Sequence, residues 1–121
     1  MASIEYLSYD DNVDHLTIYR SDSDIDKTID TGLVLLNLNK EKEIVGIEIM
    51  GAHKNFKISL EVLQHITGCT VNIQYEPHRQ LVILNIMLQY EQQESPIVFS
   101  YETIDLGTSA FSQNFACAAA V

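Results

Sequence analysis

The sequence predicts an α+β domain that is mostly antiparallel β, with about seven strands in meander order and one short helix near residues 59–67. Three observations support this class. Strand-length runs of β-branched, aromatic and other apolar residues recur along the chain. Acidic or polar turns separate these runs, and only residues 59–67 place apolar side chains at helical spacing. The strands are expected to form either one curled sheet or two packed sheets.

The first half of the chain predicts four strands. Residues 4–9 and 15–20 carry β-forming side chains and are joined by the acidic segment 10–14, which is typical of a hairpin. After a polar segment, apolar residues resume at Ile29 and run without interruption over Leu33–Leu36. Continuous apolarity of this kind predicts a strand that is covered on both faces.

The fourth strand is expected at residues 44–50, where alternation places two sets of side chains on opposite faces. One face would carry Val45, Ile47 and Ile49, and the other Gly46, Glu48 and Met50. Glu48 is therefore an acid inside an otherwise apolar strand. Burial would raise the pKa of its carboxyl group, as in many catalytic carboxylates. An open face would instead expose Glu48 to solvent or to a partner. The alternation favours the open face.

Residues 59–67 predict the helix. Ser59 is a candidate N-cap and Glu61 lies in the first turn, where an acid is favourable. Leu60, Val62, Leu63 and Ile66 form an apolar stripe at helical spacing. Gly68 would then end the helix in a left-handed conformation.

The second half predicts three further strands, at residues 71–75, 81–90 and 97–102, with a turn at 76–80. The run Leu81–Leu84 is apolar on both faces and so predicts a central strand. The core is expected around one set of apolar side chains from both halves: Leu16, Ile18, Val34, Leu36, Val45, Ile47, Leu63, Ile83 and Leu84.

We expect residues 1–108 to form a single β-rich domain and residues 109–121 to form a flexible tail, since the tail mixes small, polar and apolar residues without periodicity. Residues 4–52 and 70–104 are candidates for a pseudo-repeat, because Tyr9-Asp10 and Tyr75-Glu76 each precede a turn and a further apolar strand. The second half has no counterpart of Gly46–Ile49. A chance recurrence of a strand–turn–strand pattern therefore stays open.

Composition limits the classes of partner. Seventeen acidic against seven basic residues give a formal charge of −10, which repels nucleic acid and anionic membrane surfaces. The apolar runs are shorter than the ~20 residues of a membrane-spanning helix. The N-terminal residues lack the basic and apolar regions of a secretory signal. Cys69 and Cys117 show no disulfide-framework spacing, so a cytoplasmic protein with reduced cysteines is expected.

No motif for catalysis or metal binding emerges. The acidic segment Asp22–Asp26 is similar to the opening of an EF-hand loop, but the required glycine and the final glutamate are replaced by Lys27 and Leu33. The histidines at positions 15, 53, 65 and 78 lack metal-ligand spacing. Cys69 has no basic neighbour, and there is no glycine-rich phosphate loop. We therefore expect no catalytic residues, no metal and no cofactor.

Residues 9–18 and 46–49 resemble the signature of a small, uncharacterised prokaryotic β-rich family, known as a domain of unknown function. Its members typically read YD-x-x-x-D-x-L-x-I near the start and G-I-E-I at the end. The resemblance covers about residues 5–52. It implies a fold unit and no established activity, so its positions carry no assigned role: Tyr9, Asp10, Asp14, Gly46 and Glu48.

The sequence therefore predicts a non-enzymatic, acidic protein-interaction or regulatory module. Members of the family are similar in size and acidity to small proteins encoded beside RNase-like toxins, which implies neutralisation of a basic partner as one form of this function. The alternative is a small-ligand-binding β-domain that uses the interior or mouth of a curled sheet. A homodimer is expected, because one short helix cannot cover the two-sided apolar strands at residues 33–36 and 81–88.

Overall fold

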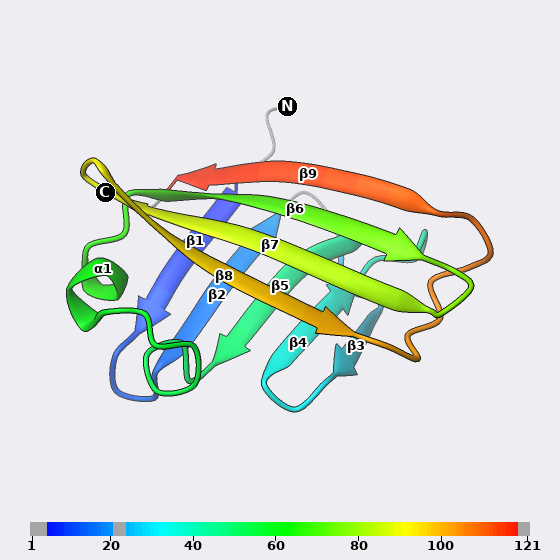
Figure 1. Cartoon of the computed structure of the whole chain (residues 1–121), viewed down its shortest axis with the longest axis horizontal. Helices are drawn as coiled ribbons and strands as arrows, with labels where there is room; N and C mark the ends of the chain where they lie inside the picture. Colours follow the sequence, from blue (N-terminus) through cyan, green and yellow to red (C-terminus); the bar gives the residue numbers. More distant parts are fainter. Residues whose placement is uncertain (1–4, 21–23, 119–121) are drawn as a thin grey trace.

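The computed structural model describes residues 5–20 and 24–118. Within these residues, nine strands form two sheets, and one short helix lies at an end of the molecule (Figure 1). The sheet β6–β9 lies over the sheet β1–β5, and the strands of the two layers cross (Figure 1). The predicted class, mostly antiparallel β with one short helix, is confirmed. The strands form two packed sheets rather than one curled sheet.

The first sheet has five strands in the order β1-β2-β5-β4-β3, all antiparallel to their neighbours. Its strands are β1 (Glu5–Asp10), β2 (His15–Arg20), β3 (Lys27–Asp30), β4 (Val34–Leu38) and β5 (Ile44–Met50). The second sheet has four strands in the order β8-β7-β6-β9. These are β6 (Gly68–Glu76), β7 (Leu81–Tyr90), β8 (Gln93–Tyr101) and β9 (Phe111–Ala118).

The predicted meander order is wrong in both sheets. In each, three hairpin-connected strands are joined by a fourth from elsewhere in the chain: β2 beside β5, and β9 beside β6. This is Greek-key connectivity. β5 takes the centre of its sheet because most of its residues are buried, whereas the short strand β3 is mostly exposed and lies at the edge.

Strand β3 was not predicted as a separate element, because Ile29 is its only apolar residue. A tight turn separates it from β4. Gly32 adopts φ +101°, and its amide donates to the Asp30 carboxylate over 2.8 Å. The Thr31 amide donates to the Val34 carbonyl over 3.0 Å. The run from Ile29 to Leu36 is thus a hairpin rather than one strand.

The predicted flexible tail is wrong for Phe111–Ala118, which pair along nearly all of β6. The same sandwich therefore extends past residue 108. Exposed and less exposed residues alternate strictly along β9, with Phe111, Phe115 and Cys117 on the less exposed side. The side chains on the more exposed side are small or polar, so the hydrophobic pattern of the sequence did not indicate a strand here. Residues 119–121 lie outside the described part.

The core lies between the two sheets. Of the predicted core set, every member except Ile83 is buried. Burial alternates along β7, so Ile83 lies half-buried on the outer face although β7 is a central strand. Leu33 and Leu35 likewise lie outside the core, so the two-sided cover predicted for residues 33–36 is wrong. A register shift between β4 and β5 brings Ile44 into the core cluster next to the buried Val45.

Helix α1 (Leu60–Gln64) is shorter than predicted and closes one end of the sandwich (Figure 1). Val62 and Leu63 are its buried residues. The helix ends at His65, and Gly68 begins β6 instead of terminating the helix. The two predicted repeat units fall into different sheets, and internal duplication stays a prediction.

The N-cap of helix α1 at Ser59 can be tested by substitution. The Ser59 hydroxyl accepts a hydrogen bond from the Val62 amide over 3.2 Å. We expect Ser59→Ala to lower the free energy of unfolding by about 1 kcal/mol, because this amide loses its partner. Ser59→Asp, which keeps an acceptor, should remain within about 0.5 kcal/mol of the wild type in urea denaturation. Equal losses in both variants would contradict the assigned cap.

Candidate functional site

Two of the signature residues meet at the β1–β2 turn. Asp14 is the last residue of this turn and adopts φ 54°. Its Oδ1 accepts hydrogen bonds from the Tyr9 hydroxyl over 2.7 Å and from the His53 amide over 2.9 Å. Its Oδ2 accepts from the Lys54 amide over 3.0 Å. The Asp14 carbonyl also accepts from the Gly51 amide over 2.8 Å. One residue thus holds the loop that follows β5 against the turn that precedes β2.

The protonation states of this pair agree with a structural role. Burial alone would raise the pKa of Asp14, but the hydrogen bonds from Tyr9 and from the amides of His53 and Lys54 hold it below its ordinary value. Burial, and then the hydrogen bond to Asp14, raise the pKa of the Tyr9 hydroxyl. Tyr9 is therefore a stable donor and Asp14 a stable acceptor near neutral pH.

Asp10, the third signature residue, is exposed at the end of β1. Its Oδ1 accepts a hydrogen bond from the Asn12 amide over 3.0 Å and so shapes the β1–β2 turn. This contact is separate from the Asp14 cluster. The Asp10 side chain thus stabilises its own turn.

Glu48, the fourth signature residue, lies on the outer face of the first sheet in a chain of polar contacts. Its Oε2 accepts from Asn37 Nδ2 over 3.1 Å, and Asn37 Oδ1 accepts from the Thr28 hydroxyl over 2.8 Å. Its Oε1 lies 3.2 Å from His15 Nε2, a distance that makes an ion pair when the histidine is protonated. The same nitrogen has no hydrogen-bond geometry to any partner. These contacts connect β2, β5, β4 and β3 across the sheet.

The Glu48 carboxylate is intermediate between the two alternatives posed by the sequence. It is 27% exposed, so it is neither deeply buried nor fully open. The His15–Glu48 pair has the chemistry to move a proton. Both Glu48 oxygens, however, already contact side chains of neighbouring strands. This arrangement is suited to holding strands together.

Gly46, the last signature residue, is where two side chains approach the backbone. It pairs with Tyr19 on β2 and with Asn37 on β4. A Cβ atom at this position would lie 2.8 Å from Tyr19 Cδ2 and 2.8 Å from Asn37 Nδ2. The aromatic ring therefore occupies the space that a side chain on β5 would need.

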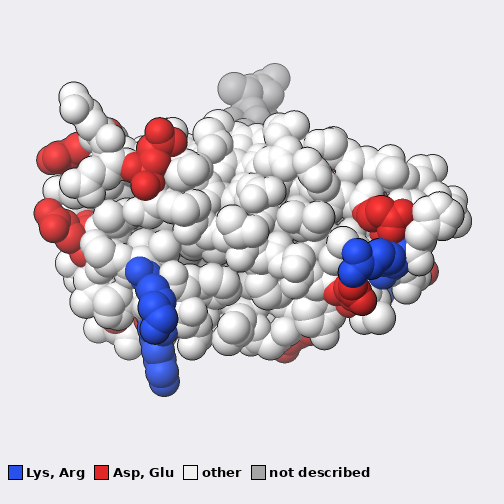
Figure 2. Space-filling model, in the orientation of Figure 1, with Lys and Arg blue, Asp and Glu red and all other residues white. Residues whose placement is uncertain are grey.

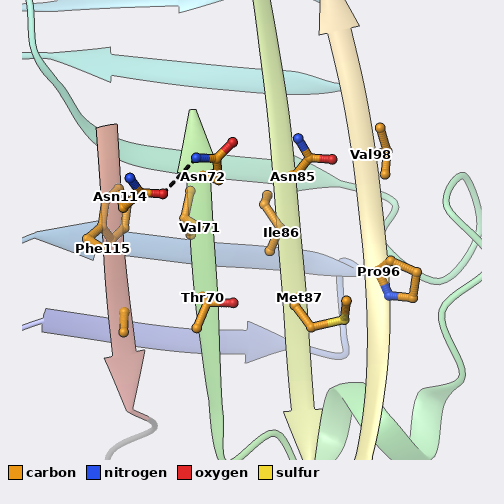
Figure 3. Close-up of a pocket in the computed structure, with 11 residues that line it drawn as sticks. Thr70, Val71, Asn72, Asn85, Ile86, Met87, Pro96, Val98, Asn114 and Phe115 are labelled. Carbon is orange, nitrogen blue, oxygen red and sulfur yellow. Dashed lines mark hydrogen bonds between the residues drawn. The ribbon is translucent and has the colours of Figure 1, made fainter. Parts of the chain in front are cut away.

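A different feature, without signature residues, dominates the outer face of the second sheet. Two rows of side chains cross all four strands of this sheet (Figure 3). The first row is Val98, Asn85, Asn72 and Asn114, and the second is Pro96, Met87, Thr70 and Ala116. We call these eight residues the uncharged face. They line an open hollow of about 620 Å³.

The uncharged face contrasts with the rest of this acidic chain. Neither row contains an acidic or basic residue, although the chain carries a formal charge of −10. The next row toward the β6–β7 turn is also uncharged: Ser100, Ile83, Gln74 and Ser112. In Figure 2 most charged side chains lie toward the two ends of the molecule, and the centre of this view is uncharged. Val98 is 65% exposed at the margin of the face.

Residues 7–53 match the family model of a protein of unknown function, DUF2283. The expected resemblance of the first half to an uncharacterised small domain family is thereby confirmed. The matched segment contains Tyr9, Asp14 and His53, so it includes the contact that closes the loop after β5. No curated protein and no solved structure matches the chain.

The matched segment ends before β6, so the uncharged face lies outside it. Among the described residues, no group of three or more His, Cys, Asp or Glu side chains could hold a metal ion. No helix in the described ranges is long and apolar enough to cross a membrane. The acidic segment Asp22–Asp26 lies partly outside the described residues.

Sequence reasoning missed the uncharged face and the position of Asn37. Asn37 is 4% exposed, yet nothing in its local sequence distinguishes it from a turn residue. The face did leave a signal. The outward positions of β6 and β7 include Thr70, Asn72, Asn85 and Met87, with no charge among them. Solvent-facing strand positions in an acidic protein would ordinarily include acids.

Proposed function

We propose that this protein is a non-enzymatic interaction module that forms a two-fold homodimer through the uncharged face. The observation that carries the proposal is the pair of uncharged rows around an open hollow in a chain of charge −10. Val98, Pro96, Met87 and Ala116 make part of the uncharged face apolar, and exposed apolar surface marks interaction sites in soluble proteins. The hydrogen bond that Glu48 accepts from Asn37, within the row of contacts that joins four strands, supports a structural rather than a catalytic use of the strongest acid candidate.

A second copy of the chain can occupy the uncharged face without bringing acidic side chains together. Two molecules of charge −10 repel each other, but contact through the uncharged face keeps the acids apart. Asn72 Nδ2 already donates to Asn114 Oδ1 over 2.7 Å (Figure 3), but each amide both donates and accepts, so the remaining donors and acceptors of Asn72, Asn85 and Asn114 can pair with a second copy. A self-complementary patch is what a two-fold axis requires.

The outer surface of the second sheet, with the uncharged face at its centre, is large enough to contribute most of a dimer interface. The sheet has four strands, and β7 spans ten residues. At about 4.8 Å between strands and about 3.3 Å per residue, the outer surface of the whole sheet projects to roughly 600 Å², and the two rows of the uncharged face occupy its central part. A specific interface buries about 800 Å² on each partner, and corrugation raises the accessible area above the projected area. Contacts at the rim would supply the remainder.

Val98→Lys tests this proposal. Val98 is 65% exposed at the margin of the face, so a charge there would have to be buried against the partner copy. We therefore expect the dissociation constant of the dimer to rise at least tenfold. Val13 is also 65% exposed but lies in the β1–β2 turn, so Val13→Lys is a matched control. Sedimentation equilibrium should give twice the 13.7 kDa chain mass for the wild type and for Val13→Lys. A concentration-independent monomer in the wild type would refute the homodimer.

A basic protein partner is the second candidate, because exposed acids such as Asp10 and Asp11 accompany the formal charge of −10. Its binding would weaken steeply with added salt, whereas contact through the uncharged face would not.

A small ligand in the hollow is the alternative from another class, since about 620 Å³ lies within the usual range of ligand sites. Native mass spectrometry would reveal it as added mass that Val98→Lys removes without changing the oligomeric state.

A further inference from the structure

The two cysteines, distant in the sequence, face each other in the second sheet. Cys69 on β6 and Cys117 on β9 are direct partners in the strand register. Both belong to the core cluster, so their side chains project from the same face of the sheet. Cys69 is 1% and Cys117 is 5% exposed. Both are thiols in this structure.

We propose that Cys69 and Cys117 form an intramolecular disulfide bond that joins β6 to β9. Residues directly opposite in antiparallel strands have Cα atoms about 4.5 or 5.5 Å apart, depending on the type of pair. Disulfides span Cα separations of about 4.4 to 6.8 Å, so either type of pair is within range. The bond requires rotation of both side chains and, because opposite Cβ atoms lie about 4.5 to 5.5 Å apart and a disulfide needs about 3.5 to 4.5 Å, a small local approach of the two strands.

The bond forms by exchange with a small disulfide such as oxidised glutathione. One cysteine thiolate attacks a glutathione sulfur, which gives a mixed disulfide and releases one glutathione thiolate. The second cysteine then attacks the mixed disulfide, closes the Cys69–Cys117 bond and releases the other glutathione. Two cysteine thiols are oxidised, and one glutathione disulfide is reduced to two thiols. The chain contains two cysteines, so no third thiol competes.

The position of β9 makes the buried pair reachable and gives the bond a consequence. Among the described strands, β9 lies at the edge of its sheet and pairs with β6 alone. Cys117 lies one residue before its end, where edge strands open most readily. A bond at this point would fasten the strand that carries Asn114 and Ala116 of the uncharged face. Oxidation is thus expected to stabilise the fold without blocking that face.

The test is equilibration of the folded wild type with a glutathione redox buffer, followed by denaturation and alkylation. We expect the oxidised protein to lose two hydrogen atoms in mass and to resist alkylation. Digestion without reductant should give one linked peptide pair containing Cys69 and Cys117. The Tm of the oxidised protein should exceed that of the reduced protein by about 10 °C, since the bond closes a long loop.

Single alanine variants provide the matched controls. Cys69→Ala and Cys117→Ala should each take up one glutathione or remain a thiol, and neither should gain Tm on oxidation. The proposal is overturned if the wild type keeps two alkylatable thiols at every redox poise. A wild-type product with glutathione retained on one cysteine, or with a bond between two chains, would overturn it equally.

Discussion

Asp14→Ala is expected to lower the free energy of unfolding by about 3 kcal/mol. The substitution removes the acceptor for the Tyr9 hydroxyl and for the amides of His53 and Lys54. Alanine is also less favourable than aspartate at φ 54°, which adds to the loss. Urea denaturation followed by circular dichroism measures the effect. The loop after β5 should also become more susceptible to proteolysis, because Asp14 no longer holds it.

Asp14→Asn is the matched control for this prediction. Asparagine tolerates a positive φ, and its Oδ1 can still accept from Tyr9 and His53. Its amide group cannot accept from the Lys54 amide, so a smaller loss of about 1 kcal/mol is expected. If both variants lose the same amount, the hydrogen bonds to Tyr9 and His53 are not what stabilises this turn.

The same carboxylate predicts a pH dependence. The pKa of Asp14 in the folded protein lies below its ordinary value of 3.8, so the folded state binds this proton less tightly than the unfolded state does. Its stabilising contribution is therefore present above about pH 4 and is lost as the pH falls through the lowered pKa. The difference in unfolding free energy between wild type and Asp14→Asn should shrink over that acidic range. A difference that stays constant between neutral and acidic pH would contradict the assignment.

Much of the local structure could be predicted from the sequence, because it depends on residues close together in the chain. The two predicted hairpins are present at residues 5–20 and 68–90, and so are the strand at 44–50 and the Ser59 cap. The two missed strands had weak local signals. Ile29 is the only apolar residue of β3, and β9 is built of small and polar residues on its outer side. Their stability comes from pairing with β4 and β6, which local periodicity does not report.

The sequence predicted which strand or turn holds each signature residue. It did not predict which residues they contact. Asp14 accepts from His53 and Lys54, and Glu48 accepts from Asn37, all of which are distant in the sequence. These contacts depend on strand order, and the predicted meander would not have placed β2 beside β5. The opposition of Cys69 and Cys117 likewise follows from the pairing of β9 with β6. Register between distant strands was the missing information.

Gly46→Val is expected to lower the free energy of unfolding by about 3 kcal/mol, although strand propensity alone predicts the opposite sign. Valine is a far better strand former than glycine. If strand propensity alone determined the effect, the substitution would therefore raise the free energy of unfolding. The Cβ atom, however, would lie 2.8 Å from both Tyr19 Cδ2 and Asn37 Nδ2. Asn37 cannot swing aside without breaking its hydrogen bonds to Thr28 and Glu48.

A graded series separates these two effects. Gly46→Ala should lower the free energy of unfolding by about 2 kcal/mol, less than valine does, because overpacking grows with side-chain volume. In a Tyr19→Ala background one of the two close contacts is removed, so the cost of Gly46→Ala should fall by about 1 kcal/mol. Met50→Val, on the same face of β5 without such an approach, should change stability by less than about 1 kcal/mol. An increase in stability from glycine to alanine to valine at position 46 would show that strand propensity, and not the packing of Tyr19 and Asn37 against the backbone, governs this position.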